Sequence, residues 1–410
     1  MNILLITQMY PQPDDVGENK PTKTVEYFAK EWAVSGNRVF VIHCPSKFPL
    51  PFYLFPSSVK DRFTGRKSTI TPSIKSRKPI SRSENGIAVY RLPMFKLCPG
   101  QAYSERKMKS QSKKICVILS ENDFVPDIVL GHFANPSLEL VAQIAEYYDA
   151  KSSIVFHHDG TEKNIRKYGI DKLIHRIGAV GARSIVEAEA IQNLLSLEKK
   201  PFVCYSGVPN DAIDSCEKVC TKHDYQNGVK YIYVGSLIKN KCVNTVITAF
   251  SKKYHSQKKN GAATLSIVGA GPEFDALNAL VAENHMEDLI TLSGRSSRNE
   301  VLGKMHESHI FAMVSIGETF GMVYIEAMLQ GCIVIASIGG GFDGIIQDGV
   351  NGFLCTPGDA KMLEEIYDLI CGMSVEERNR IGQRAIDTAL GFSEKAVAER
   401  YLNDVLTLQR

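Results

Sequence analysis

The sequence predicts an α/β protein with two Rossmann-like domains, each containing a parallel sheet covered by helices. The chain has 410 residues, too many for one ordinary core, which favours two domains of roughly 200 residues. Its hydrophobic content of 44% and charged content of 23% are those of an ordinary soluble globular protein. Short apolar, β-rich runs alternate with helical patterns almost throughout, which favours doubly wound layers around parallel sheets.

The N-terminal half contains the first series of predicted strands. We expect them at 2–7, 38–43, 87–92, 127–132, 152–157, 182–188 and 201–206. The apolar start has no basic leader or cleavage site and is interpreted as a strand rather than a signal peptide. A helical pattern at 22–36 ends on a glycine, as many helices do. The apolar residues of the segment 46–83 follow neither a helical nor a strand period, so the segment is expected to form a long, partly mobile loop.

The C-terminal half contains a second series of strands. We expect these at 229–235, 264–271, 289–294, 309–315, 332–337 and 352–355. The polar segment 210–228 separates the two series and sets the domain boundary. The end of the chain is helical with a break at which Ser393 caps a last helix. The predicted domains are therefore 1–209, 210–392 and a terminal helix at 393–410.

Charge and cysteine content bound the function classes. Ten cysteines occur without C-x-x-C pairs, so buried cytosolic thiols are expected rather than disulfides or a metal site. No stretch approaches the roughly 20 apolar residues that span a bilayer. The segment 47–114 has 16 lysines and arginines against three acids, a balance of +13, so the rest of the chain carries −10. Such a basic block indicates an anionic partner.

The stretch "SIGETFGMVYIEAMLQGC" carries the clearest chemistry. It follows a predicted buried strand and is interpreted as a loop and then a helix beginning near Gly321. The backbone N–H groups of Gly321, Met322 and Val323 would be unpaired first-turn donors. Together with the helix dipole they would form a natural phosphate seat.

Two glutamates flank this seat. Carboxylates beside a phosphate would be repelled by it, but they accept hydrogen bonds from hydroxyl groups. A ligand with hydroxyls on both sides of a diphosphate is a nucleoside diphosphate sugar, so Glu318 would hold the sugar and Glu326 the ribose. Either glutamate alone is better explained as a helix-dipole acid or part of a solvated helix face. The two together with the Phe-Gly turn favour the ligand.

The segment "ETFGMVYIE" resembles the E-x7-E motif of the retaining family 4 glycosyltransferases, also called glycosyl transferases group 1. The resemblance extends, in order, through "FHHDGT", "YSGVPND", "YVGSLIKNKCVNTVITAF", "IVGAGPEFDAL", "ITLSGRSSRNEV" and "GGGFDGIIQDGVNGFLCTPGD". It implies the GT-B fold, in which two facing Rossmann-like domains border a central cleft. It also implies an N-terminal acceptor domain, a C-terminal nucleotide-sugar domain and a last helix that returns to the first domain.

The resemblance assigns roles to further residues. It gives Lys241 the neutralisation of the donor diphosphate and His158 a contact with the reacting sugar and phosphate. It places the remaining binding positions at Gly17, Gly235, Ser236, Gly294 and Arg295, the last two beside the nucleobase. For Lys241, His158 and Arg295 the alternative is an ordinary surface or local hydrogen-bonding residue.

The chain departs from the family pattern at three places, one of which is the loop at Gly17, where "DDVGEN" stands in place of a double glycine. Ser236 stands where the family has an arginine, and a serine cannot replace a guanidinium clamp on phosphate. Lys239 is close enough in sequence to compensate. Cys242 stands where the family has a glycine.

Neither a cofactor nor a metal is expected. The "VGAGPEF" segment has Phe274 at the third glycine position of a dinucleotide-binding pattern. No D-x-D occurs in the sequence, so we expect metal-independent transfer, with Lys241 and the helix terminus stabilising the departing diphosphate. The donor substrate would be a UDP-sugar or a GDP-sugar.

The function expected from these features is a retaining, hexosyl-type transferase acting on a glycan or lipid-linked glycan acceptor in bacterial surface polysaccharide assembly. The basic segment 47–114 would place a cytoplasmic enzyme on the inner face of the cell membrane. A solvated basic loop is the alternative, and nucleic acid is disfavoured because no binding module accompanies the charge. A non-catalytic nucleotide-sugar scaffold, suggested by Ser236, and a GT-B epimerase remain alternatives.

Overall fold

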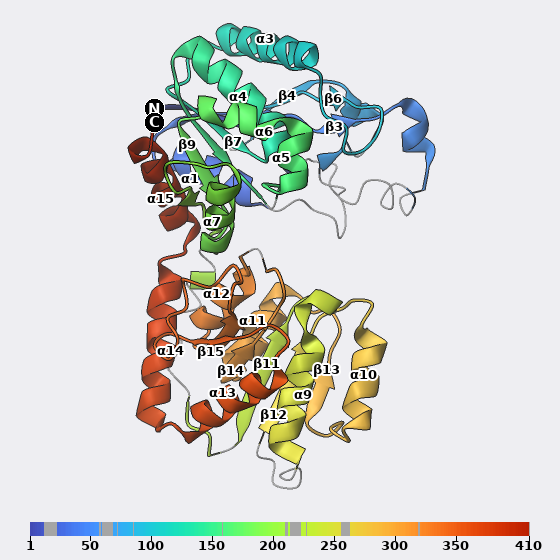
Figure 1. Ribbon diagram of the computed structural model, residues 1–410, viewed down its shortest axis with the longest axis vertical. Helices are drawn as coiled ribbons and strands as arrows, with labels where there is room; N and C mark the ends of the chain where they lie inside the picture. Colours follow the sequence, from blue (N-terminus) through green and yellow to red (C-terminus); the bar gives the residue numbers. More distant parts are fainter. Residues whose placement is uncertain are drawn as a thin grey trace. The chain divides into compact units, whose positions relative to one another are not determined.

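The structure is a computed structural model that divides into two compact units. It describes residues 1–11, 23–56, 59, 69–71, 73–84, 86–157, 159–209, 212–213, 223–226, 228–255, 263–318 and 320–409. The first unit comprises Met1–Arg183, Glu187–Tyr205 and Glu394–Arg410, and the second comprises Ser184–Val186 and Ser206–Ser393. Each is a layered α/β unit (Figure 1).

The first unit is built on a sheet with the strand order β10-β9-β8-β7-β1-β2-β5-β4. All neighbouring strands run parallel except β4 and β5. The central strand β1 is buried from Ile3 onward, which explains its uninterrupted apolar sequence. The bounds are β1 (Asn2–Thr7), β2 (Arg38–His43), β4 (Ile80–Glu84), β5 (Ile87–Arg91), β7 (Ile128–His132), β8 (Lys151–Val155), β9 (Ala179–Ala182) and β10 (Phe202–Val203), with a separate pair β3 (Ser46–Lys47) and β6 (Met94–Phe95).

Helices cover this sheet. Their bounds are α1 (Thr24–Val34), α3 (Glu105–Glu121), α4 (Ala134–Tyr148), α5 (Glu162–Tyr168), α6 (Ile170–Leu173), α7 (Ile185–Leu194) and α15 (Glu394–Thr407), with 3-10 turns η1 (Leu50–Leu54), η3 (Lys75–Arg77) and η4 (Ile174–Arg176). In the described part of the chain, no helix is both long and apolar enough to cross a membrane.

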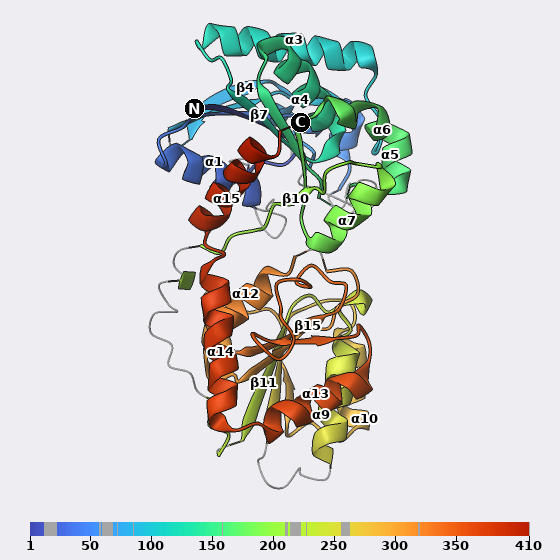
Figure 2. The same cartoon turned by 60° about the vertical axis from the view of Figure 1, so that its left-hand side comes forward.

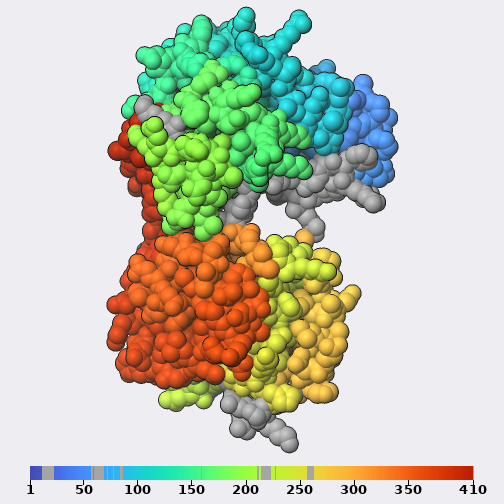
Figure 3. Space-filling view, viewed as in Figure 1, coloured from blue at the N-terminus to red at the C-terminus, as the bar shows by residue number. Residues whose placement is uncertain are grey.

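The last helix, α15, packs beside α1 of the first unit (Figure 2), and Figure 3 shows its dark red surface against the green part of that unit. The indole Nε1 of Trp32 donates a hydrogen bond to the carbonyl of Ala398 at 2.9 Å. The Trp32 ring also lies 5.3 Å from the ring of Tyr401, and both side chains are buried. Large buried aromatic residues contribute strongly to packing, so these contacts fix the C-terminal helix to the first unit.

The second unit has a wholly parallel sheet with the order β13-β12-β11-β14-β15-β16. The strands are β11 (Val229–Val234), β12 (Ala263–Val268), β13 (Ile290–Leu292), β14 (Ile310–Ala312), β15 (Ile333–Ser337) and β16 (Phe353–Cys355). The helices are η5 (Lys239–Lys241), α9 (Val243–Tyr254), α10 (Phe274–Glu283), α11 (Arg298–Glu307), α12 (Met322–Leu329), α13 (Ala360–Gly372) and α14 (Val375–Leu390).

The strand order of the second unit reverses between β11 and β14. The chain moves outward from β11 through β12 to β13, then returns to the other side of β11. Helix α9 packs with α10 and α13, whereas α12 packs with α11 and α14. These two groups of helices cover the sheet. Such a reversal opens a ligand crevice at the carboxyl ends of the two diverging strands.

Two predictions about local structure are wrong. Of the strand expected at 182–188, only Ala182 is extended, and helix α7 begins at Ile185. There the carboxylate of Glu187 accepts a hydrogen bond from the backbone N–H of Arg183 at 3.0 Å, which stabilises the start of the helix.

The segment 46–83 is also more regular than expected. Strands β3 and β4 lie in it, and β4 pairs antiparallel with β5. Residues 80–83 are exposed at the sheet edge, so backbone pairing orders them without an apolar period. Residues 57–58, 60–68 and 72 of this segment lie outside the described residues.

Candidate functional site

The loops at the carboxyl edge of the second sheet are joined by backbone hydrogen bonds. The N–H of Leu237, after β11, donates to the carbonyl of Ala270, after β12, at 3.0 Å. The N–H of Ile316, after β14, donates to the carbonyl of Asn240 at 2.7 Å. The loops that border the reversal in strand order are therefore held together as one surface.

Two glycines after β12 allow these loops to pack closely. A Cβ atom on Gly269 would lie 1.8 Å from the carbonyl oxygen of Gly235. A Cβ atom on Gly271 would lie 2.2 Å from the carbonyl oxygen of Leu237. Both distances are far inside van der Waals contact, so the G-x-G spacing has a packing role here.

Helix α12 begins directly after Gly321, which adopts a φ of 81°. A Cβ atom there would lie 2.4 Å from the ring of Tyr324, whose hydroxyl donates to the Met313 carbonyl at 2.6 Å. In the described part of the chain, the N–H groups of Gly321, Met322 and Val323 donate to no protein acceptor. The helix start thus retains three donors for an anion.

Lys241 and Glu318 form an ion pair at this edge. Lys241 ends the turn after β11 and Glu318 lies in the loop after β14, so the pair connects the two sides of the reversal. Their side chains are 18% and 13% exposed. The N–H of Gly341 donates to the Glu318 carbonyl at 2.9 Å and fixes that loop from the β15 side.

The residue after Lys241 adopts a left-handed conformation. Cys242 has a φ of 50°, a region in which glycine is favoured over residues with a Cβ atom. This backbone geometry explains why the family resembled by the sequence has a glycine at this position.

Glu326 is held by an arginine from the neighbouring helix. The Nε of Arg298 lies 3.1 Å from Oε1 of Glu326, whose side chain is 17% exposed. Arg298 is the first residue of α11, and a capping box formed by Ser297 and Glu300 fixes that helix start. The second glutamate therefore also faces a cation.

Two tyrosines near Glu318 remain neutral donors. Burial, and then the negative charge of Glu318, raise the pKa of Tyr233. The same two causes, in the same order, raise the pKa of Tyr324. Since Tyr233 donates to the carbonyl of Ser236 at 3.1 Å, its hydroxyl supports the loop after β11.

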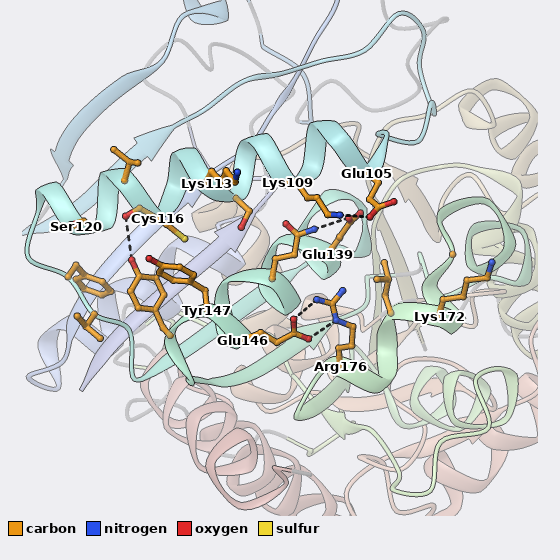
Figure 4. A pocket seen from close by; sticks show the side chains of 18 of the residues that line it. Glu105, Lys109, Lys113, Cys116, Ser120, Glu139, Glu146, Tyr147, Lys172 and Arg176 are labelled. Carbon is orange, nitrogen blue, oxygen red and sulfur yellow. Dashed lines mark hydrogen bonds and ion pairs between the residues drawn. The ribbon is translucent and has the colours of Figure 1, made fainter.

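A groove of about 1370 Å³ on the first unit contains none of the predicted site residues (Figure 4). It lies among α3, α4 and α6, and several of its charged groups pair with one another. Arg176 pairs with Glu146 at 2.5 Å and Lys109 with Glu105 at 2.7 Å. The predicted site is therefore not in this groove.

Part of the second unit matches a known domain family. Residues 222–388 match the family described as Glycosyl transferases group 1. The chain contains a group 1 glycosyltransferase domain.

Two relatives match the chain over most of their own length. The N-acetyl-alpha-D-glucosaminyl L-malate synthase of Bacillus anthracis is 25% identical over 321 residues, covering 77% of this chain and 80% of the relative. A Bacillus subtilis (strain 168) protein, TuaC, named as a glycosyltransferase of teichuronic acid biosynthesis, is 25% identical over 83% of this chain and 82% of its own length.

Solved structures show the fold. Anabaena Alr3699/HepE in complex with UDP has a TM-score of 0.66 at 17% identity and covers 100% of both chains. A glycosyltransferase from Rickettsia africae ESF-5 has a TM-score of 0.65 at 18% identity, covering 99% of this chain and 98% of the other. The predicted α/β fold with two Rossmann-like domains of the GT-B class is confirmed.

The group 1 domain brings many of the predicted residues to one edge of its sheet. These are Gly235, Ser236, Lys241, Gly294, Glu318, Gly321, Met322 and Val323, with Glu326 one turn further along α12. Arg295 is exposed in the loop before α11. Gly17 and His158 lie outside the described residues.

Sequence reasoning did not select Arg298, which the structure pairs with Glu326. The signal was present in "SSRNE", where Ser297 and Glu300 have the spacing of a capping box. That spacing predicts a helix start at 298, which fixes the position of Arg298 and leaves Arg295 in the preceding loop.

Proposed function

We propose that the protein is a metal-independent, retaining glycosyltransferase that moves a hexosyl group from a UDP-sugar or GDP-sugar to a glycan or lipid-linked glycan. The observation that carries the proposal is the Lys241–Glu318 pair beside the open amides of α12. The named activities of the relatives and the UDP bound by HepE support the same class of donor.

Binding of the donor would break this ion pair and give each of its two residues a new partner on the ligand. A diphosphate carries more negative charge than one carboxylate and would attract Lys241 away from Glu318. The amides of Gly321, Met322 and Val323 would bind its oxygens, and the released Glu318 carboxylate would accept hydrogen bonds from the sugar. Because these groups are already placed, they would stabilise the charge that grows on the diphosphate as the glycosidic bond breaks.

Glu326 would recognise the ribose. Its carboxylate is oriented by Arg298, which leaves acceptor capacity for ribose hydroxyls. The sites inferred by resemblance at Gly17 and His158 would complete the contacts to the reacting sugar.

We further propose that the enzyme works on the inner face of a bacterial cell membrane in surface polysaccharide assembly. The described part of the basic segment includes four exposed cations on α3, which are Arg106, Lys109, Lys113 and Lys114. Each basic residue near an anionic leaflet is worth about 1 kcal/mol. Sedimentation with vesicles tests this: equal binding to neutral and anionic vesicles, or binding to neither, would contradict it.

A thermal-shift screen against nucleotide sugars tests the donor class. A ligand present at 100 times its dissociation constant should stabilise the protein by about 2.7 kcal/mol. The configuration of the product, determined by NMR, tests retention. Loss of turnover in EDTA with recovery on adding a divalent ion would contradict metal independence.

Ser236 supports a second candidate, a non-catalytic nucleotide-sugar scaffold, because the family arginine that would clamp phosphate is absent. A scaffold would bind the nucleotide sugar without turnover. A GT-B epimerase would convert the donor without any acceptor. Incubating the identified donor with and without acceptor separates the three.

A further inference from the structure

A small pocket lies at the carboxyl edge of the first unit's sheet. Its volume is about 200 Å³, and its walls include Gln8, Ser46, Phe48, Phe133, Asn135 and Asn164. Pockets that enclose drug-sized molecules measure about 300–1,000 Å³, so this one admits a single ring or a charged group. Phenyl walls and several amide and hydroxyl groups suit a sugar ring.

Lys96 in the wall of this pocket is buried and has no acidic partner among the described residues. The residue is 5% exposed, and its ammonium lies 4.5 Å above the centre of the Tyr103 ring. Among the described residues it forms no ion pair with a carboxylate. A contact with an aromatic face offsets only part of the cost of burying a charge.

The surroundings of Lys96 are positive. Burial, followed by the charges of Lys167 and Lys107, lowers its pKa to about 8. The one carboxylate among the described residues that line the pocket belongs to Asp159, and it accepts hydrogen bonds from the backbone N–H groups of Ala134 at 2.5 Å and His157 at 2.7 Å. Among the described residues Lys96 therefore has no carboxylate partner, because Asp159 is bonded to backbone amides instead.

Building on the transferase function proposed above, we propose that this pocket binds the negatively charged group of an acidic acceptor sugar. Lys96 supplies the counter-charge for a carboxylate or a phosphate on that sugar. The phenyl and amide walls contact the ring. The acceptor class is thus an anionic sugar rather than a neutral one.

Matched probes test the charge preference on the full chain. Methyl glucoside is the neutral probe, glucuronate carries a carboxylate and glucose 6-phosphate carries a phosphate. Inorganic phosphate alone is the fourth probe. Binding is measured by ligand-observed NMR for the wild type, for Lys96→Met and Lys96→Gln, and for Lys172→Met, which removes an exposed lysine of α6 as a matched control.

The wild type should bind at least one anionic sugar about 10-fold or more tightly than methyl glucoside, since charge-assisted hydrogen bonds are the stronger ones. Both Lys96 variants should lose that preference, and Lys172→Met should keep it. The proposal is overturned if the wild type shows no preference, if the Lys96 variants retain it, or if inorganic phosphate binds as tightly as the sugars. Since the wild-type comparison stands alone, a variant that fails to fold leaves the proposal testable.

The nucleotide screen separates this proposal from the transferase function. If no nucleotide sugar binds, the transferase function fails whatever the probes show. If a nucleotide sugar binds and turns over but anionic probes show no preference, only the acceptor class fails. Nucleotide binding should be unchanged in Lys96→Met, because the residues assigned to the nucleotide, Lys241 and Glu326, lie in the second unit.

Discussion

The cations at the carboxyl edges of the two sheets differ in whether a carboxylate pairs with them. At the edge of the second unit, Lys241 pairs with Glu318 and Arg298 pairs with Glu326. At the edge of the first unit, Lys96 faces an aromatic ring and has no carboxylate partner among the described residues. Among the described residues, the two cations Lys241 and Arg298 are paired with carboxylates, and we call this the balanced edge; Lys96 is not, and we call its site the unbalanced pocket.

The difference suggests which kind of ligand each edge binds. A balanced edge holds its groups in place, and a ligand must offer more charge than the partner it displaces, as a diphosphate does. An unbalanced pocket is stabilised by any anion that fits, so it selects by charge. The paired edge would then serve the donor and the unpaired pocket the acceptor.

Removing Glu318 should have the largest effect on the balanced edge. We expect Glu318→Ala to lower kcat about 10²–10³-fold, the usual loss when a preorganised electrostatic group is removed from a site. The fold should be retained, which circular dichroism and thermal melting would show. Glu365→Ala, which removes an exposed glutamate of α13, is the control and should keep full activity. Equal rates for the two variants would place the chemistry elsewhere.

Removing Lys241 should weaken diphosphate binding by about 10- to 100-fold, the size expected for a lost charge-assisted contact. Titration calorimetry with the nucleoside diphosphate and with its nucleoside measures this, and only the diphosphate should be affected by Lys241→Met. Lys239→Met removes the exposed lysine at the start of the same turn. A larger loss in Lys239→Met would mean that Lys239, rather than Lys241, is the main lysine contact of the diphosphate.

The strands could be predicted because burial leaves a pattern in the sequence. The strand expected at 38–43 is β2, which is buried from Val39 onward and apolar from Val39 to Ile42. The edge strand β4 left no such pattern, since its residues 80–83 are exposed and only its backbone is paired. The helix start at Gly321 was predictable because the glycine and the preceding loop are local features.

The charge pairs could not be predicted in the same way. The residues of each pair lie in different loops or helices, and only the fold brings them together. Lys96 is the clearest case. In the sequence it is one of the 16 basic residues of 47–114, whereas in the structure it is 5% exposed. Burial of a single lysine leaves no periodic signal that distinguishes it from its solvated neighbours.

The pH dependence of anion binding sharpens the description of the unbalanced pocket. Because the pKa of Lys96 is lowered to about 8, the side chain is mostly charged at pH 7 and mostly neutral at pH 9. The affinity for glucuronate, whose carboxylate is ionised at both values, should therefore fall about tenfold over this range. An ordinary lysine would remain charged and give a flat profile. NMR titrations at several pH values measure this, and Lys96→Met should show no such dependence.

The smallest expected effect comes from removing the helix cap that positions Arg298 at the balanced edge. The hydroxyl of Ser297 accepts a hydrogen bond from the N–H of Glu300 and caps the helix that begins with Arg298. Ser297→Ala should lower the free energy of unfolding by about 1 kcal/mol. It should also weaken nucleoside binding two- to threefold by loosening Arg298, an order-of-magnitude estimate for a contact acting through another residue.

The matched control is Ser374→Ala, which removes the same kind of cap, with Glu377, from α14. The two variants should lose similar stability in denaturant titrations, but only Ser297→Ala should lose affinity. If both bind the nucleoside as the wild type does, the orientation of Arg298 does not depend on its helix cap.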